Sequence, residues 1–381
     1  MRLFFLEFRK LLRCRFLWLL LAVFLAYDIF IVWDTVGRNS EIYHDMYKVI
    51  MQTGTDLTGN ADKIAAMLNS ENEIENYYAD YVKAYGDIYR DFDIHSILYA
   101  KIFSYKNFQP AGSYYEWICR NYDKLQKRVE QIKAAQEDKY AFYPGINYKV
   151  HSILFTSVLR MLLLQILILT ALAVLYLMDY ERIQKTEYLT YSSRTGRKIQ
   201  LIKWLSGMAM SMIYAVILIS ISMLLFLLFV PMRGLWETPV SSFMVMQQRG
   251  FYLYPYITFV RLSFGKYLLL SLLTVFLLII LVGILSGTVQ LFFRNSYLTM
   301  LSIGMFFLGL IALPYLFSTG FLHTAMALNP AILWYMCGGW FIEYDPAVSF
   351  AWSEFVTVGI WFIIMLPLFN FGKRYFMNID L

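Results

Sequence analysis

The sequence predicts an all-α polytopic membrane protein with six transmembrane helices, and composition and segment length are the observations that predict it. Of the 381 residues, 59% are hydrophobic, and the mean hydropathy is +0.52, above the value for a soluble domain. A helix needs about 20 apolar residues to cross the hydrocarbon core of a bilayer. Runs of this kind occupy residues 16–34, 151–178, 204–231, 266–293, 297–318 and 350–371.

The distribution of Lys and Arg predicts the orientation of these crossings. Positive charges in short loops mark the cytoplasmic side, and the long segment 35–150 is left out of the comparison. One side holds Arg2, Arg9, Lys10, Arg13, Arg15, Arg182, Lys185, Arg194, Arg197, Lys198, Lys203, Arg294, Lys373 and Arg374, and the other holds Arg233, Arg249, Arg261 and Lys266. We therefore expect both termini in the cytoplasm, with residues 372–381 as a cytoplasmic tail.

The same charges bear on location and partners. The net charge of +6 follows from this topology, so it predicts no nucleic-acid partner. No Asn-x-Ser/Thr glycosylation site occurs in the outer segments, which is compatible with a bacterial origin. We expect a multi-pass protein of a bacterial plasma membrane.

Residues 1–15 predict an amphipathic interfacial helix. At about 100° per residue, one arc holds Phe4, Phe5, Phe8, Leu11 and Leu12, and the other holds Arg2, Glu7, Arg9, Lys10 and Arg13. Such a helix lies in the headgroup layer, with its arginines facing anionic membrane lipid. The alternative is a plain charged extension.

Residues 35–150 predict a helical extracellular domain inserted between helices 1 and 2. Two capping boxes, Ser70-x-x-Glu73 and Ser113-x-x-Glu116, indicate helix starts. Apolar stripes follow both of them and are expected to pack on each other: Ile74, Tyr78, Tyr81, Tyr85 and Tyr89, then Ile118, Tyr122, Leu125, Val129 and Ile132. The tyrosine stripe is either core or an exposed recognition surface.

Two outer loops are unusually apolar. The loop 231–265 is rich in aromatic rings, which is typical of a belt at the membrane interface. Residues 319–349 are too apolar for a free loop, and we expect a re-entrant or interfacial element after the fifth helix. A seventh crossing is the alternative.

The sequence offers little for catalysis. Gly54 to Asn60 has the glycine spacing of a phosphate-binding loop, but Asn60 stands where Lys is required. The four histidines are far apart in sequence, so no metal site is expected. Asp91-x-Asp93-x-His95 fits a cation or sugar-nucleotide site, although a solvated acidic surface explains it equally well. We expect no catalytic residue and no cofactor in this chain.

Two charges fall within the apolar runs. Asp28 lies about 18 Å from the inner boundary at 1.5 Å per residue, and Arg160 lies at a similar depth in the next crossing, which runs the opposite way. Because ionisable groups in a membrane require partners, we expect an Asp28–Arg160 pair. Alternatively, both lie beyond the lipid, in the base of the outer domain. Gln165 and Glu354 are weaker candidates for lining a path.

The loop 179–203, DYERIQKTEYLTYSSRTGRKIQLIK, is the most informative stretch. It resembles the cytoplasmic loop of ABC-2 type exporter permeases, which have a Glu, then Gly-Thr-x-Glu-x-Leu-Leu, a Pro/Ser-Arg turn, and a Lys opening the third helix. The matching residues are Glu181, Thr186, Glu187, Leu189, Ser193, Arg194 and Lys203. Lys185 replaces the usual Gly, and Ser192 stands near the usual Pro.

The resemblance implies a permease subunit of an ATP-driven exporter. In that family a separate cytoplasmic ATPase, which holds ATP and Mg²⁺, docks on this loop, and two permease copies, identical or different, surround the path. The resemblance assigns ATPase docking to Glu181, Thr186, Glu187, Leu189 and Arg194. The apolar, aromatic interior favours a hydrophobic or amphipathic cargo such as a peptide, lipid or drug.

Two alternatives remain at the level of sequence, and a third lacks the residues that it needs. One is a non-transporting membrane sensor or immunity protein whose extracellular domain binds an antimicrobial peptide. Another is that the loop 179–203 is merely basic, as the positive-inside rule requires. A membrane enzyme would need clustered polar residues at one depth, which the sequence does not show.

Overall fold

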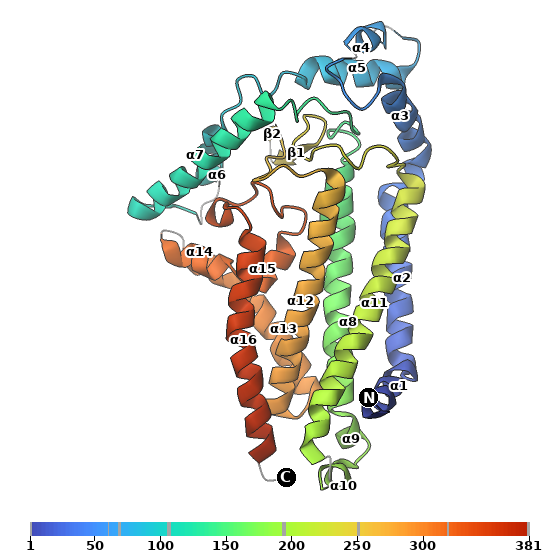
Figure 1. The fold of residues 1–381 in the computed structure, drawn as a ribbon, viewed down its shortest axis with the longest axis vertical. Helices are drawn as coiled ribbons and strands as arrows, with labels where there is room; N and C mark the ends of the chain where they lie inside the picture. Colours follow the sequence, from blue (N-terminus) through green and yellow to red (C-terminus); the bar gives the residue numbers. More distant parts are fainter. Residues whose placement is uncertain are drawn as a thin grey trace.

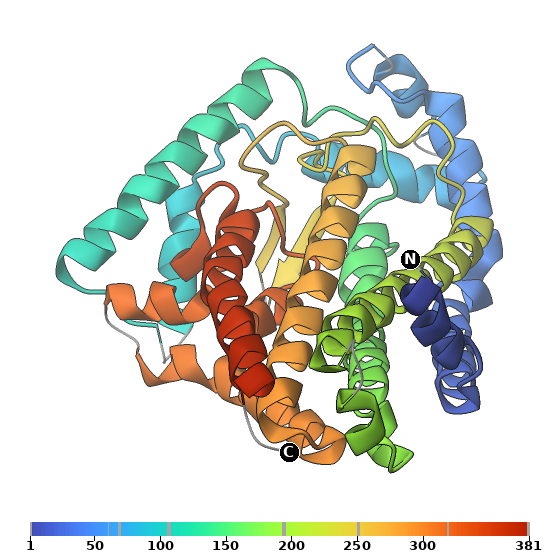
Figure 2. The same ribbon diagram turned by 60° about the horizontal axis from the view of Figure 1, so that its bottom comes forward.

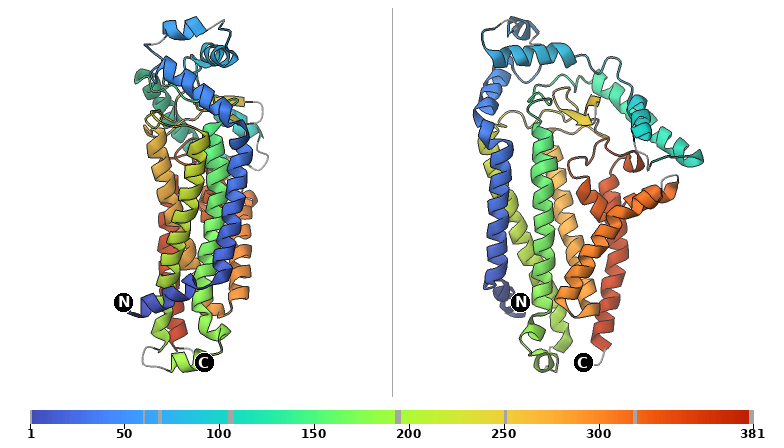
Figure 3. Two further views of the ribbon diagram at one scale, coloured as in Figure 1. Left: turned by 90° about the vertical axis from the view of Figure 1, so that its right-hand side faces the viewer. Right: turned by 180° about the vertical axis from the view of Figure 1, so that it is seen from behind.

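In the described part of the computed structural model, six helices are long and apolar enough to cross a membrane, as predicted. The structure describes residues 2–59, 61–67, 70–104, 108–192, 196–249, 252–317 and 320–378. The long helices run side by side as a bundle, with shorter helices covering one end (Figure 1). Both chain termini lie toward the opposite end (Figure 3). We call the end covered by the shorter helices the apical cap, and the end that holds the termini the basal end. The chain is a multi-pass α-helical membrane protein.

The bundle consists of α2 (Arg15–Thr35), η2 (Ser152–Leu159) continued by α8 (Arg160–Met178), α11 (Ile199–Phe229), α12 (Phe264–Phe293), α13 (Ser296–Ala312) continued by η4 (Leu313–Leu316), and α16 (Ser353–Asn378). Helix α11 begins five residues before the expected 204, because its first turn packs at the basal end instead of forming loop. Helix α16 extends through most of the expected tail.

Helix α8 is the centre of the bundle. In its most apolar window 72% of the residues are buried, against 17% for the span Ser296–Leu316. Close packing against α11 depends on a small residue, since a Cβ added at Gly207 would lie 3.0 Å from the Cα of Val174. Helix α13 therefore presents most of its surface outward, while α8 is enclosed by its neighbours.

The apical cap contains α3 (Ser40–Thr53), α4 (Ala61–Met67), α5 (Glu73–Tyr85), α6 (Ile94–Ser104) and α7 (Gly112–Ala134). Tyr78, Tyr81 and Tyr89 are buried, so the tyrosine stripe is core. The two apolar stripes bury against different partners, since α5 packs on α3 and α4, whereas α7 packs on α6. The two stripes were expected to pack on each other, but the main helical neighbours of α5 are α3 and α4, and that of α7 is α6.

Both predicted capping boxes are displaced. Helix α5 is capped by Asn72, whose side chain accepts a hydrogen bond from the backbone N–H of Ile74, while the Ser70 hydroxyl donates to Glu75 at 2.8 Å. Helix α7 already begins at Gly112, which places Ser113 inside the helix. In each case the sequence pattern is present, but the chain enters the helix at a different residue.

Two buried ion pairs hold the cap in place. Lys101 on α6 donates to both carboxylate oxygens of Glu343 at 2.5 and 2.6 Å, and the Tyr122 hydroxyl of α7 donates to the same carboxylate. Arg128 on α7 pairs with Glu137, with Nη2 and Oε2 2.5 Å apart. The first pair ties the cap to the segment that precedes α16.

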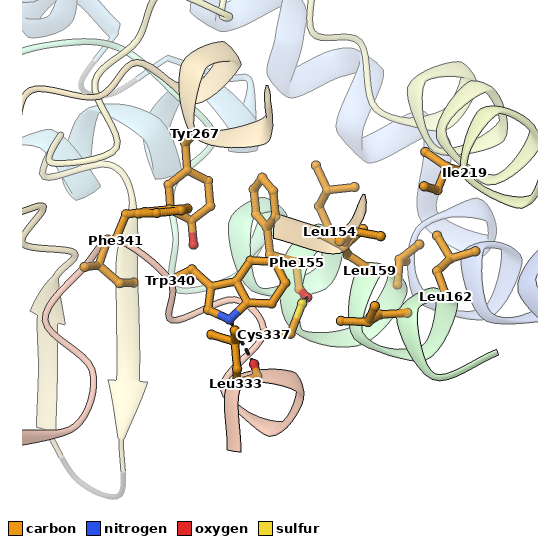
Figure 4. Packing of buried hydrophobic residues seen from close by; sticks show 14 of the residues in the cluster. Leu154, Phe155, Leu159, Leu162, Ile219, Tyr267, Leu333, Cys337, Trp340 and Phe341 are labelled. Atoms are coloured by element: carbon orange, nitrogen blue, oxygen red, sulfur yellow. Dashed lines mark hydrogen bonds between the residues drawn. The ribbon is translucent and has the colours of Figure 1, made fainter. Parts of the chain in front are cut away.

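The apolar segment before α16 folds back on the bundle. It forms α14 (Phe321–Ala327) and α15 (Pro330–Tyr335), both too short to cross a membrane. Figure 4 shows Trp340 and Cys337 packed beside Phe155 of η2, with the Trp340 indole donating to the Leu333 carbonyl at 2.9 Å. The part of this segment that the structure describes adds no seventh crossing.

The other apolar loop contains a β-hairpin that the sequence analysis missed. Strand β1 (Met246–Arg249) pairs antiparallel with β2 (Tyr252–Pro255), in the register Met246 to Pro255. The rings of this loop suggested only an interfacial belt, because aromatic residues favour strands and membrane interfaces alike.

Candidate functional site

Two short helices extend from the basal end of the bundle (Figures 1 and 2). They are α9 (Tyr180–Ile183) and α10 (Glu187–Tyr191). The turn between them is a Schellman motif, with the N–H of Thr186 bonded to the carbonyl of Glu181 at 2.8 Å and that of Lys185 to Arg182 at 3.0 Å. Lys185 has φ +56°, the left-handed conformation that glycine adopts most easily.

A cluster of four charges lies under this turn. Lys203 of α11 and Glu181 of α9 form an ion pair in which their side chains are 0% and 6% exposed. Lys10 of α1 (Arg2–Leu12) lies 3.1 Å from the other Glu181 oxygen and 2.7 Å from Glu7. Two carboxylates and two ammonium groups therefore balance one another where α1, α9 and α11 meet.

This cluster corrects two expectations. Glu181 was expected to face a docking partner, but it is buried and serves as an internal anchor. Glu7 was placed on the charged outer arc of α1, yet it is buried with Leu11, because that face of the helix packs on α11. The bundle supplies the charges that make both burials possible.

Further hydrogen bonds connect the turn to the other basal elements. The Asp179 carboxylate accepts from the Ser296 hydroxyl at 2.8 Å and from the Ser296 N–H at 3.2 Å, at the start of α13. Gln200 donates to the Tyr191 hydroxyl at 2.6 Å. Arg197 donates to the carbonyl of Met377 at 2.7 Å, near the end of α16. The α9–α10 unit is thus linked to α1, α11 and α13. It also contacts α16 directly, because the ring of Tyr191 meets that of Phe376 edge-on at a centroid distance of 5.6 Å.

The outer surface of the unit is apolar and exposed. Leu189 is 77% exposed, Tyr188 67% and Ile183 55%. Of the other predicted docking residues, Thr186 is exposed and Glu187 is half-buried. Arg194 lies outside the described residues. The predicted site therefore divides into an anchored base and an exposed apolar edge.

The expected Asp28–Arg160 ion pair is not formed in the part of the chain that the structure describes. Asp28 instead accepts a hydrogen bond from Gln165, with Nε2 and Oδ1 2.8 Å apart. Gln165 follows Arg160 by five residues on α8, which turns it about 140° around the helix axis. The rotation of α8, and not depth alone, selects the partner of Asp28.

An apolar groove of about 660 Å³ opens on the side of the bundle, between α2, α8 and α13. Its lining residues are Phe16, Leu17, Leu172, Leu175, Tyr176, Asp179, Ile183, Ser296, Tyr297, Met300, Leu301, Gly304, Met305 and Leu308. The groove begins beside the α9–α10 unit, because its lining includes Ile183 of α9 and the adjoining residues Asp179 and Ser296.

The sequence analysis missed the contributions of Glu7, Lys10 and Asp179 to this site. One signal for Glu7 was available, because it shares a helical face with Phe4 and Leu11 at spacings of three and four residues. Within the described ranges, no group of three or more His, Cys, Asp or Glu side chains could hold a metal ion.

Comparisons with family models, with curated proteins and with solved structures found no match to this chain.

Proposed function

We propose that this chain is the permease subunit of an ATP-driven exporter of the ABC-2 type, powered by a separate cytoplasmic ATPase. The observation that carries the proposal is the α9–α10 unit, which combines an exposed apolar edge with a base fixed by buried charges. An exposed Leu and Tyr on a charged helical unit suit a groove on a soluble partner. The excess of Lys and Arg at the basal end favours a cytoplasmic location for this unit.

The anchored base explains how a docked ATPase would move the bundle. A displacement of α9 reaches α11 through Glu181 and Lys203, and it reaches α1 through Lys10. The contact of Asp179 with Ser296 carries it to the start of α13. Because α9 is joined to several helices by short polar contacts, these elements would shift together as rigid bodies. ATP and Mg²⁺ belong to the ATPase.

The lateral groove supports a hydrophobic or amphipathic cargo, such as a peptide, lipid or drug. Tyr297, Leu301 and Met305 expose 90%, 63% and 63% of their surfaces beside the groove. A second permease copy, identical or different, would cover this face and enclose a path between the two bundles. The apical cap would then be extracellular and stand over the exit, while α1 lies at the inner lipid headgroups.

The alternative of a sensor or immunity protein assigns recognition of an antimicrobial peptide to the apical cap. Its tyrosine stripe does not favour that function, since Tyr78, Tyr81 and Tyr89 are buried. The exporter hypothesis gives a role to both the α9–α10 unit and the lateral groove, so we prefer it.

Affinity purification of the full chain from its native membrane in mild detergent tests the proposal. We expect an ATPase with a phosphate-binding loop to be recovered with the unaltered chain. Leu189→Arg should reduce that recovery about tenfold or more, because charging the centre of an apolar contact costs at least about 2 kcal/mol. Phe103→Arg, which alters an 89% exposed ring on the apical cap, is the matched control and should leave recovery unchanged.

Two results would contradict the proposal. One is that no ATPase accompanies the unaltered chain, and the other is that Leu189→Arg and Phe103→Arg recover it equally well.

A further inference from the structure

A single carboxyl group lies in the middle of α2, buried against α8. Asp28 is 2% exposed and stands about 20 Å along the helix from Arg15, at 1.5 Å per residue. Its Oδ1 accepts a hydrogen bond from Nε2 of Gln165, which is 5% exposed. The contact joins two helices at a depth where water does not normally reach.

Each side chain in this contact has one oxygen atom that accepts no hydrogen bond from a described residue. Oδ2 of Asp28 and Oε1 of Gln165 are both buried, and neither has a hydrogen-bond partner among the residues that the structure describes. If Asp28 is ionised, both of these oxygens are acceptors only, so neither can satisfy the other. Buried polar atoms without partners are rare and costly. Two unsatisfied acceptors in one contact indicate that the pair is not an ionised carboxylate beside an amide.

In the described part of the chain, no cation forms an ion pair that would stabilise a negative charge on Asp28. The charged groups and the histidine on or beside the elements packed against this part of α2 are Arg160, Lys203, Arg38 and His151, and α2 itself carries Arg15 and Asp34. The tyrosines on these helices, Tyr27, Tyr176 and Tyr214, carry no positive charge in either protonation state. Lys203 pairs with Glu181 and Arg38 with Asp34, and none of these groups forms an ion pair with Asp28 within the described residues. An isolated carboxylate in an apolar interior takes up a proton to become neutral.

We propose that Asp28 carries a proton in this structure and forms a neutral acid–amide pair with Gln165, so that the α2–α8 contact is a proton-binding site inside the membrane. The protonated Oδ2 becomes a donor for which Gln165 Oε1 is the acceptor. The terminal torsions of both side chains are broad, so the second hydrogen bond forms by small rotations. One proton thereby satisfies both unpartnered oxygens.

The proposal has a consequence for movement. Asp28 can release its proton only when water enters between α2 and α8, so loss of the proton reports the separation of these helices. The proposal does not depend on the exporter hypothesis, because it rests only on the Asp28–Gln165 contact.

Infrared spectroscopy of the full chain in lipid nanodiscs at neutral pH tests the protonation directly. We expect the carbonyl band of protonated carboxyl groups to lose intensity in Asp28→Asn, which keeps the shape of the side chain. Asp34→Asn is the matched control on the same helix, since the Asp34 side chain is 46% exposed and paired with Arg38. Gln165→Leu should shift the remaining Asp28 band, because the acid loses its hydrogen-bond partner.

Chemical labelling of the unaltered chain covers the case in which Asp28→Asn fails to fold. Dicyclohexylcarbodiimide is apolar and reacts with protonated carboxyl groups, and mass spectrometry locates the adduct. An adduct on Asp28 at about pH 7.5 as well as at about pH 4.5 supports the proposal, because exposed carboxyl groups are ionised at the higher pH. The proposal is overturned by an infrared band unchanged in folded Asp28→Asn, or by the absence of an Asp28 adduct at about pH 7.5.

Discussion

Substituting Glu181 with Gln removes the negative charge that compensates the most deeply buried ammonium group of the basal end. The Lys203 side chain is 0% exposed, and it has no route to solvent without displacement of α9 or α11. Lys10 also faces Glu181 at 3.1 Å, but its side chain is 25% exposed and it retains Glu7. The loss of the negative charge therefore affects Lys203 more than Lys10.

The structure sets the order of the effects. Breaking a buried ion pair from one side costs about 3–5 kcal/mol, because it leaves an uncompensated charge. We expect this loss of unfolding free energy for Glu181→Gln. Lys203→Met should cost less, about 1.5–3 kcal/mol, since Glu181 retains its charge-assisted contact with Lys10. The double variant should be more stable than Glu181→Gln alone, because no buried charge is left unpaired.

Equilibrium unfolding in mixed micelles, followed by tryptophan fluorescence, measures these differences for the two single variants and the double variant. Lys198→Met, a charge removal on the adjacent 3-10 turn η3 (Gly196–Lys198), controls for the loss of a basal positive charge. If the unfolding free energy lost in the double variant equals the sum of the two single losses, Glu181 and Lys203 are not coupled. That result would refute their assignment as a buried ion pair that anchors α9 to α11.

Two further predictions concern the turn and the cap. Lys185→Gly should stabilise the chain by about 1 kcal/mol, because it relieves the cost of a left-handed backbone at a residue with a Cβ; Lys185→Ala should give no gain in the same unfolding experiment. Lys101→Met should cost about 3–5 kcal/mol by leaving the Glu343 carboxylate buried without its cation. Tyr122→Phe should cost only about 1–3 kcal/mol, since it removes one hydrogen bond to that carboxylate. Equal losses for these two cap variants would contradict the assignment of Lys101 as the main partner.

The turn at Lys185 illustrates what a sequence resemblance can and cannot indicate. The family loop that residues 179–203 resemble has a Gly where this chain has Lys185, and the structure shows a positive φ at Lys185. Lys185 thus adopts a backbone conformation in which glycine carries no steric cost, so its side chain is not the one best suited to the turn. The same pattern suggested that Glu181 faces a partner, which burial against Lys203 contradicts.

The sequence by itself determined the six apolar helices and the charge bias between the two ends of the bundle. Both depend on local composition, because the length of an apolar run and the position of Lys and Arg do not require a neighbour. The capping boxes were less informative, since several residues near each start can serve as the cap.

Only the tertiary structure decided which polar groups meet. Asp28 and Gln165 are separated by 137 positions in the chain, and their contact depends on the rotation of α2 and α8 about their own axes. Glu181 meets Lys203 and Lys10 because α1 and α9 pack on the first turns of α11. A one-residue change in helix rotation turns a side chain by about 100°, so partners buried between helices are fixed by packing and not by depth or spacing along the sequence.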